Sequence, residues 1–72
     1  MYRRIRNLRE DLDISQERVA NLLNVTQATY SRYENGTLQI PLDSLIKLAL
    51  FYNTSTDYLL NLTSNKKPYS RN

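Results

Sequence analysis

The fold of this chain is decided by residues Ser15–Gly36, which have the sequence SQERVANLLNVTQATYSRYENG. The first half of this stretch carries apolar residues at helical spacing. Ser15, directly before them, is a typical N-cap, because its side chain can accept a hydrogen bond from a free N–H group of the first turn. Glu17 in that turn suits the positive end of the helix dipole. The pattern predicts a helix over Gln16–Leu23.

A three-residue connector separates this helix from the next one. Asn24 tolerates the left-handed backbone conformation that ends many helices, and Thr26 is a second N-cap. We expect the next helix over Thr26–Asn35. It ends at Gly36, the only glycine of the chain, which can take the left-handed position after the last turn. Two short helices joined by such a turn are the geometric minimum of a helix-turn-helix.

Further helices are predicted on both sides of this pair. Residues 2–11 form an amphipathic pattern, with Ile5, Leu8 and Leu12 at helical spacing among arginines. After the pair, Pro41 suits the first turn of a fourth helix. Its apolar residues form a broad stripe that we expect to be mostly core: Leu42, Leu45, Ile46, Ala49 and Phe51 or Tyr52.

A short fifth helix is predicted near the end of the chain, because Thr54 and Asp57 are spaced like a capping box before Tyr58, Leu59 and Leu60. No segment shows the alternation typical of a strand, so the expected fold is all-α with five helices. Residues 63–72 show no apolar periodicity and are predicted to be a flexible basic tail. Residues 1–62 would then be one small domain.

The composition excludes several classes of protein. The chain of 72 residues has no cysteine and no histidine, which removes disulfides, thiolate nucleophiles, most zinc sites and the commonest general base. We therefore expect no metal and no cofactor. No apolar run approaches the roughly 20 residues of a membrane span, so we expect a cytoplasmic protein without a membrane partner.

Basic residues are unevenly distributed along the chain. Ten Lys and Arg oppose seven Asp and Glu, for a net charge of +3. This distribution fits a surface that faces phosphates, and it also fits ordinary solvated helix faces. Charge alone leaves both interpretations open. The basic residues gather at the two ends, as Arg3, Arg4, Arg6 and Arg9 and as Lys66, Lys67 and Arg71, whereas the stretch around Asp43, Lys47 and Asp57 is slightly acidic.

The helix predicted over Thr26–Asn35 divides into two faces. Tyr30 and Tyr33 lie on one side of a helical wheel. A solvated helix surface usually carries Glu and Lys, whereas small polar residues with one glutamine and one arginine suit the edges of DNA bases. That is the composition of the opposite face, which consists of Gln27, Ala28, Ser31, Arg32 and Asn35.

These features together resemble the phage repressor and Cro family of helix-turn-helix regulators, also called the XRE family. The resemblance covers about residues 3–62. Asn24 departs from the family, which usually has glycine there, and the loop 37–39 lacks the Lys or Arg often found in it. The matching residues are Arg9, the Gln16-x-x-x-Ala20 spacing, Tyr30, the sequence Glu34-Asn35-Gly36, and IPLDSLIKLALFYNTSTDYLL over 40–60.

The resemblance implies a lambda-repressor-like DNA-binding domain. It implies a bacterial or phage-encoded transcriptional regulator that inserts the helix Thr26–Asn35 into the major groove. Of the two modes of regulation, the resemblance favours repression. The implied partner is a double-stranded, pseudo-palindromic DNA operator, bound by a homodimer with half-sites about one helical turn apart. No small-molecule ligand is expected. Control would come from protein concentration, proteolysis or a partner, or from a missing part if the chain is an N-terminal fragment.

The residues of the DNA site are carried over by position. Gln27 is the candidate for a bidentate contact to adenine, and Arg32 for guanine or a phosphate. Gln16 would bind a phosphate at the start of its helix, or simply be a helix N-terminal residue. The others have lesser roles: Ala28 and Thr29 would offer methyl groups to thymine, with a purely structural role equally open for Thr29, and Thr26, Ser31 and Asn35 would position the DNA backbone.

Other residues are expected to support the site. The resemblance implies an ion pair between Arg9 and Glu34 that joins the first and third helices. Tyr30 is expected in the core, and Tyr33 in the core or on a phosphate. Tyr52 and Tyr58 are expected in the core or on a dimer surface.

Two alternatives come from other classes of protein. The chain could be an antitoxin or another protein-interaction module with secondary DNA binding, using exposed Tyr58, Leu60 and Leu62. It could also be an enzyme, but no acid/base constellation supports that. Solvent exposure and helix-end electrostatics account for its one cluster of carboxylates, Glu10, Asp11, Asp13 and Glu17.

Overall fold

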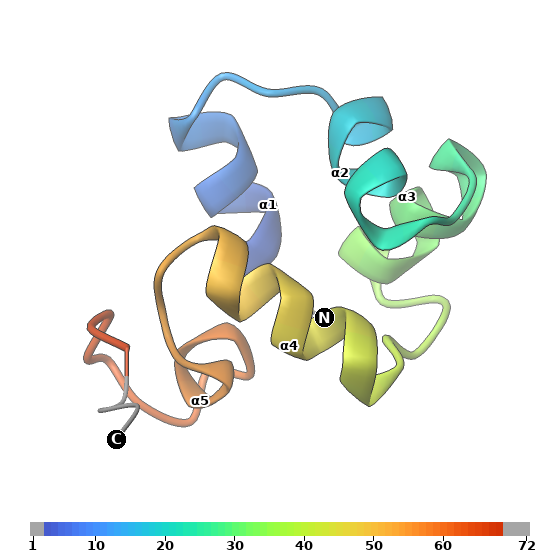
Figure 1. Ribbon diagram of the computed structural model, residues 1–72. Helices are drawn as coiled ribbons and strands as arrows, with labels where there is room; N and C mark the ends of the chain where they lie inside the picture. Colours follow the sequence, from blue (N-terminus) through green and yellow to red (C-terminus); the bar gives the residue numbers. More distant parts are fainter. Residues whose placement is uncertain (1–2, 69–72) are drawn as a thin grey trace.

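The computed structural model describes residues 3–68, which form five helices; Figure 1 shows their arrangement. No strand occurs among those residues, so the predicted all-α, five-helix fold is confirmed. None of the helices in this range is long and apolar enough to cross a membrane. Tyr2 at the predicted helix start and Arg71 in the predicted tail lie outside the described residues. The helices are α1 (Arg3–Asp11), α2 (Gln16–Leu23), α3 (Gln27–Asn35), α4 (Leu42–Phe51) and α5 (Thr56–Leu59).

Helix α2 begins and ends at the predicted residues, and α3 begins at Gln27, one residue after the predicted start, with Thr26 as its cap. The Ser15 hydroxyl accepts a hydrogen bond from the Arg18 N–H group at 3.1 Å, and the Thr26 hydroxyl accepts one from the Thr29 N–H group at 3.2 Å. Asn24 and Gly36 both adopt left-handed conformations, with φ of 62° and 81°. These local signals set the connector length, so α2 and α3 pack as one unit.

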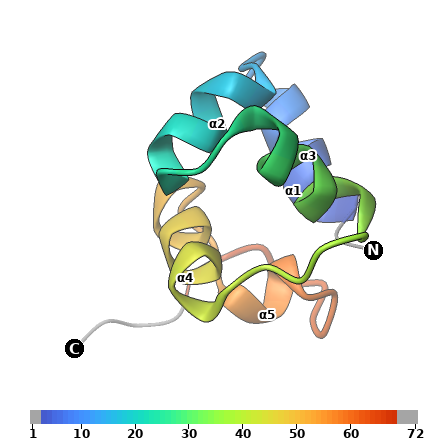
Figure 2. The same ribbon diagram turned by 90° about the vertical axis from the view of Figure 1, so that its right-hand side faces the viewer.

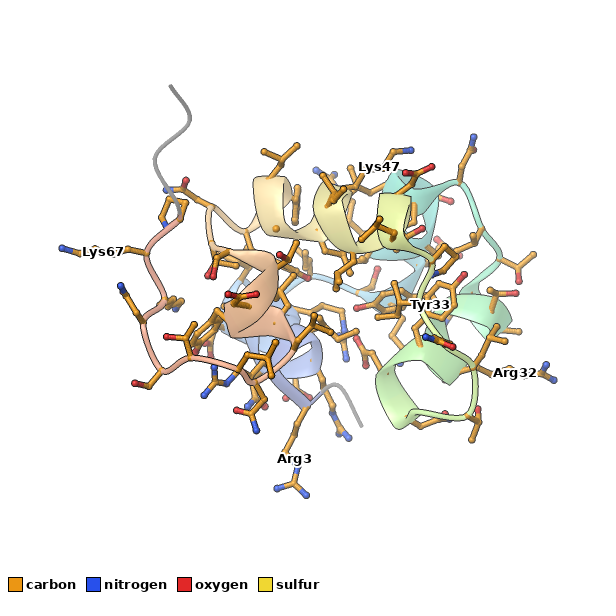
Figure 3. The ribbon with its side chains drawn as sticks, turned by 90° about the horizontal axis from the view of Figure 1, so that it is seen from below. Arg3, Arg32, Tyr33, Lys47 and Lys67 are labelled. Atoms are coloured by element: carbon orange, nitrogen blue, oxygen red, sulfur yellow. The ribbon has the colours of Figure 1, made fainter. Side chains whose placement is uncertain are left out.

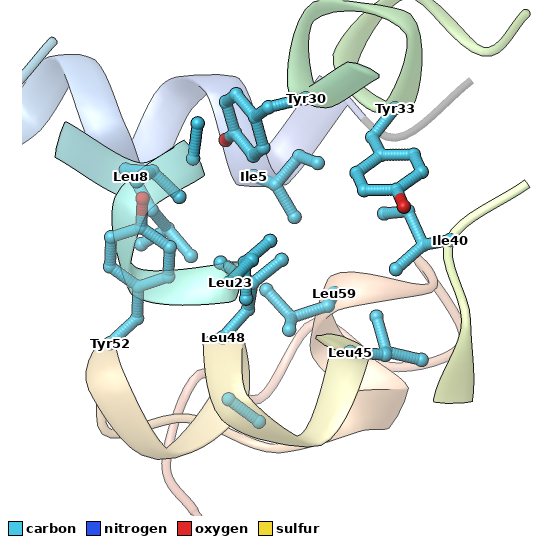
Figure 4. Close-up of a cluster of buried hydrophobic side chains, with 13 residues drawn as sticks. Ile5, Leu8, Leu23, Tyr30, Tyr33, Ile40, Leu45, Leu48, Tyr52 and Leu59 are labelled. Atoms are coloured by element: carbon cyan, nitrogen blue, oxygen red, sulfur yellow. The ribbon is translucent and has the colours of Figure 1, made fainter. Parts of the chain in front are cut away.

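One core lies between α1, the α2–α3 pair and α4, with α5 closing one end (Figures 1 and 2). Tyr30 and Tyr33 of α3 meet edge to face, with ring centroids 6.3 Å apart, so the core side of the predicted recognition helix is aromatic. Both tyrosines are buried as predicted, and so is Tyr52. Figure 4 shows the cluster: Ile5, Leu8, Val19, Ala20, Leu23, Tyr30, Tyr33, Ile40, Leu45, Leu48, Ala49, Tyr52 and Leu59.

Two apolar residues expected in the core, Leu42 and Ile46, are exposed, and so is Leu12 from the apolar pattern of the first helix. Leu12 is exposed because α1 ends at Asp11 and the chain then turns through Asp13, whose φ is 57°. Leu42 and Ile46 point away from the core, because the stripe of α4 that faces the core is narrower than predicted. That stripe consists of Leu45, Leu48, Ala49 and Tyr52.

The cap of α5 also differs from the prediction. Ser55, and not Thr54, accepts the hydrogen bond from the Tyr58 N–H group. The buried Thr54 hydroxyl instead donates to the carbonyl of Lys66. This bond and one from Arg4 to the carbonyl of Thr63 attach residues 63–66 to the domain. The flexible tail predicted over 63–72 therefore begins with anchored residues, and the domain boundary at 62 stays a prediction.

Candidate nucleic-acid interface

Helix α3 has one packed face and one free face. Tyr30, Tyr33 and Glu34 are buried. Figure 3 shows Arg32 extending away from the body of the molecule, whereas Tyr33 points inward. We call the opposite side of α3 the recognition face. Gln27, Ala28, Arg32 and Asn35 are exposed on it, and Ser31 is half-buried.

Two residues of this region hold the backbone at the ends of α3. Thr26 caps the helix, and its hydroxyl also donates to the half-buried Thr29 hydroxyl at 3.0 Å. Asn35 Oδ1 accepts from both the N–H and the hydroxyl of Thr37, at 3.1 and 2.7 Å. The side-chain NH2 group of Asn35 remains available to a phosphate. The DNA contacts assigned to these residues stay predictions.

A buried polar cluster joins the first three helices. Arg9 Nε donates to Glu34 Oε2 at 2.7 Å and Arg9 Nη2 to Oε1 at 3.2 Å, so the two residues expected to pair do so bidentately. Their side chains are only 13% and 4% exposed. Arg9 Nη1 also donates to the carbonyl of Ile14. Because α1 and α3 are pinned together here, the cluster sets the orientation of the recognition face.

Gln16 belongs to the same cluster. Its Nε2 donates to Glu34 Oε1 at 3.1 Å, which connects the start of α2 to α3. Sequence reasoning missed this contact, because 18 residues separate the partners and no local pattern relates them. The predicted phosphate contact of Gln16 stays a prediction. Its side chain is half-buried, and the free N–H groups at the start of α2 lie beside it.

The surroundings of Glu34 lower the pKa of its carboxyl group. Desolvation by burial is the largest influence and would raise this pKa. Hydrogen bonds from Arg9 and Gln16, together with the nearby Tyr30 hydroxyl, outweigh it, so the pKa lies below its usual 4.5. Glu34 is therefore ionised at neutral pH, and the bidentate pair is a charged one.

This lowered pKa predicts a loss of stability in acid. A carboxyl whose pKa is lower in the folded than in the unfolded state stabilises the fold above the unfolded value. The contribution disappears as the pH falls through the folded value. The free energy of unfolding should therefore decrease below about pH 4.5, as measured by urea denaturation at several pH values.

The Glu34→Gln variant should lose much of this acid dependence, together with stability at neutral pH. Glu10→Gln is the matched control, because Glu10 is an exposed carboxylate with a single pair to Arg6 at 3.3 Å. A Glu34→Gln profile as steep as that of the wild type would contradict the assignment.

Two buried hydroxyl groups lie beside the cluster. Tyr30 Oη and Tyr52 Oη have no hydrogen-bond partner among residues 3–68, although Tyr30 Oη is near enough to Glu34 to affect its pKa. Burial raises the pKa of Tyr30, and it raises the pKa of Tyr52 to about 12. Both rings therefore stay neutral, and their contribution is to packing.

The four arginines of α1 have different roles. Arg9 is in the buried cluster. Arg4 lies 4.1 Å above the ring centre of Tyr58, and its Nη1 donates to the carbonyls of Tyr58 and Thr63. Arg3 and Arg6 are exposed instead. Arg4 and Arg9 therefore hold the fold. Arg3 and Arg6 are on the surface, where an anion can reach them, although Arg6 also pairs with the exposed Glu10 at 3.3 Å.

Arg3 and Arg6 line a groove beside the recognition face, which we call the arginine groove. The groove has a volume of about 620 Å³ and contacts α1, the start of α2 and α3. The clustering of arginines in the first nine residues was the only sequence signal for it, and it did not distinguish these two from Arg4 and Arg9. The residues that line the groove with them include Asn7, Glu10, Gln16, Ser31 and Asn35.

Within the part of the chain that the structure describes, no three acidic side chains gather closely enough to hold a metal ion. The arrangement presents hydrogen-bond donors and cations on one side of the molecule. Its chemistry is that of a surface for binding an anionic polymer.

Comparisons with known proteins agree with this geometry. The family model described as "Helix-turn-helix" matches residues 5–59. The HTH-type transcriptional regulator YobD of Bacillus subtilis, itself described as uncharacterized, is 36% identical over 94% of this chain and 62% of its own length.

Two phage or regulatory proteins are similarly related. The cryptic phage CTXphi transcriptional repressor RstR of Vibrio cholerae is 47% identical over 68% of this chain and 44% of its own length. The HTH-type transcriptional regulator ImmR of Bacillus subtilis is 36% identical over 81% of this chain and 46% of its own length. The chain thus spans about half the length of these relatives.

Proposed function

Because this chain belongs to the Helix-turn-helix family, whose model covers residues 5–59, we propose that it binds double-stranded DNA sequence-specifically and regulates transcription as a repressor. Helix α3 enters the major groove with its recognition face toward the bases. The observation that carries the proposal is the division of α3, which buries Tyr30, Tyr33 and Glu34 and leaves Gln27 and Arg32 exposed.

The DNA contacts fall into two classes. Gln27 and Arg32 contact base edges, and Ala28 contacts a thymine methyl group. Arg3 and Arg6, which line the arginine groove of the protein, contact DNA phosphates together with the start of α2. These arginines replace the basic residue that the loop 37–39 lacks.

The proposal extends to the partners of the protein. A homodimer binds a pseudo-palindromic operator, because each copy carries one recognition helix and the major groove returns to the same side of the duplex after about 34 Å. The protein acts in the cytoplasm, on bacterial or phage DNA, as a binding protein without catalysis. The names of the relatives RstR and ImmR support regulation of this kind.

The alternative of a protein-interaction module is not favoured. It relied on Tyr58, Leu60 and Leu62 as an exposed surface. Tyr58 is half-buried beneath Arg4, and Leu60 is half-buried against the core. Of these three residues, only Leu62 is exposed, so they do not form the expected interface.

Selection of bound duplexes from random DNA tests the proposal. A selected duplex should bind about 10³-fold more tightly than a scrambled one of the same length and composition. Fluorescence anisotropy at a fixed, moderate salt concentration measures the difference. Equal affinity for the selected and scrambled duplexes would contradict sequence-specific binding.

The arginine groove makes a separate prediction about salt. Each phosphate contact contributes about 0.9 to the slope of log affinity against log salt. The Arg3→Ala/Arg6→Ala double variant should therefore lower this slope by about two per protein copy, and weaken binding to all sequences alike. The control is Lys66→Ala/Lys67→Ala, which removes the same charge far from α3. Equal slopes for both double variants would exclude the groove as a phosphate site.

A further inference from the structure

Helix α4 carries an apolar stripe that the domain does not cover. Leu42, Ile46 and Leu50 follow each other at intervals of four residues and are 68%, 42% and 56% exposed. Side chains four apart lie on one side of a helix. The buried residues of α4, among them Leu45 and Ala49, lie next to this side, so the stripe borders the core without entering it.

Two opposite charges run along the outer edge of the stripe. Asp43 and Lys47 each directly follow a stripe residue, so they lie about 100° further around α4 and on the same flank. Both are exposed, and neither forms a hydrogen bond or ion pair within residues 3–68. The flank therefore presents one unpaired charge of each sign.

This surface is complementary to itself. When two α4 helices pack antiparallel about a twofold axis through Ile46, Leu42 of each copy lies opposite Leu50 of the other. The axis keeps both charged flanks on one side of the helix pair. Asp43 of each copy then lies beside Lys47 of the other, so each apolar residue and each charge has a partner.

From this complementarity we infer that the α4 stripe is the contact surface for a second copy of this chain. The inference rests on the dimer part of the proposed function. Figure 3 supports it, because Lys47 points to the side opposite Arg3, and Arg32 points to a third side. A second copy on α4 leaves both the recognition face and the arginine groove open to DNA.

The contact is small, which determines when it forms. Helix α4 has 10 residues and a length of about 15 Å, so the pair buries less than a permanent dimer does. We expect weak association in free solution and cooperative occupation of two half-sites on one duplex, where the DNA raises the local concentration.

Charge reversal tests the arrangement. Asp43→Lys and Lys47→Asp should each weaken self-association at least tenfold, because each places two like-charged pairs in the contact. The net charge changes in opposite directions in the two variants, so a general charge effect cannot explain a loss in both. The swapped variant Asp43→Lys/Lys47→Asp should restore association to near the wild-type level. Sedimentation equilibrium measures it without DNA.

A cysteine at the twofold axis provides an independent test. The chain has no cysteine, so Ile46→Cys has only the same residue of a second copy to bond with. We expect a disulfide-linked dimer under mild oxidation, because Cα atoms within about 7 Å can be bridged. Lys67→Cys lies outside the stripe, and Figure 3 shows its side chain pointing in another direction than Lys47 of α4, so it should cross-link much more slowly. Thermal unfolding of each variant verifies that it is folded.

The outcomes separate this inference from DNA binding. Association without DNA and the Ile46 cross-link support the surface even if no duplex is bound. Variants that bind a single half-site normally but lose cooperativity on two half-sites also support it. The inference is overturned if the swapped variant stays monomeric, if Ile46→Cys cross-links no faster than Lys67→Cys, or if the wild type fills two half-sites independently.

Discussion

Replacing Tyr30 by alanine should destabilise the protein by about 3–5 kcal/mol. The Tyr30 side chain is fully buried in the core, where its ring meets Tyr33 edge to face, so its loss leaves a cavity there. A domain of this size has a total stability of roughly 4–11 kcal/mol. The variant should therefore be largely unfolded or melt far below the wild type, as circular dichroism during heating will show.

Tyr30→Phe is the matched control for this prediction. It keeps the ring and removes a hydroxyl that has no hydrogen-bond partner among the described residues. We expect a change in stability within about 1 kcal/mol, because the hydroxyl contributes only through its effect on the nearby Glu34 carboxylate. If Tyr30→Phe destabilised the protein as much as Tyr30→Ala, the hydroxyl and not the packing would be its main contribution.

Replacing Gln27 or Arg32 by alanine should weaken DNA binding and leave the stability of the fold unchanged. Both side chains are exposed and make no hydrogen bond within residues 3–68, so the melting temperature should stay within a degree or two of the wild type. Affinity for the selected operator should fall by about 10- to 100-fold for each variant, since a bidentate base contact contributes about 1–3 kcal/mol of discrimination. Anisotropy titration measures the loss.

A control must separate the base contact of Arg32 from its charge. Lys67→Ala removes the same charge, and Figure 3 shows Lys67 at the opposite end of the molecule from Arg32. Its affinity should change little at moderate salt. Arg32→Ala should in addition lose more affinity for the selected duplex than for a scrambled one. Equal losses on both duplexes would assign Arg32 to a phosphate.

These experiments address residues of one helix that have separate tasks. The Tyr30 substitution is expected to lower stability, and to lower DNA binding only through the loss of folded protein. The Gln27 substitution is expected to lower DNA binding without lowering stability. If both alanine variants lost stability and affinity in parallel, the division of α3 into a packed face and a recognition face would be wrong.

The sequence by itself determined the local architecture. The limits of α2 and α3 follow from Ser15, Asn24, Thr26 and Gly36, because caps and left-handed residues act through hydrogen bonds and sterics within one turn. The burial of Tyr30 and Tyr33 on one side of α3 also follows from helical periodicity alone. Both kinds of signal involve residues that are close in sequence, so no tertiary information was needed.

Only the tertiary structure decided which polar and apolar residues are free. Gln16 turned out to hold Glu34, and the four similar arginines of α1 divided into two structural and two exposed ones. Ile46 was expected in the core and lies on an open stripe. These outcomes depend on which neighbour arrives from a distant part of the chain, and a helical pattern specifies a face without specifying its partner.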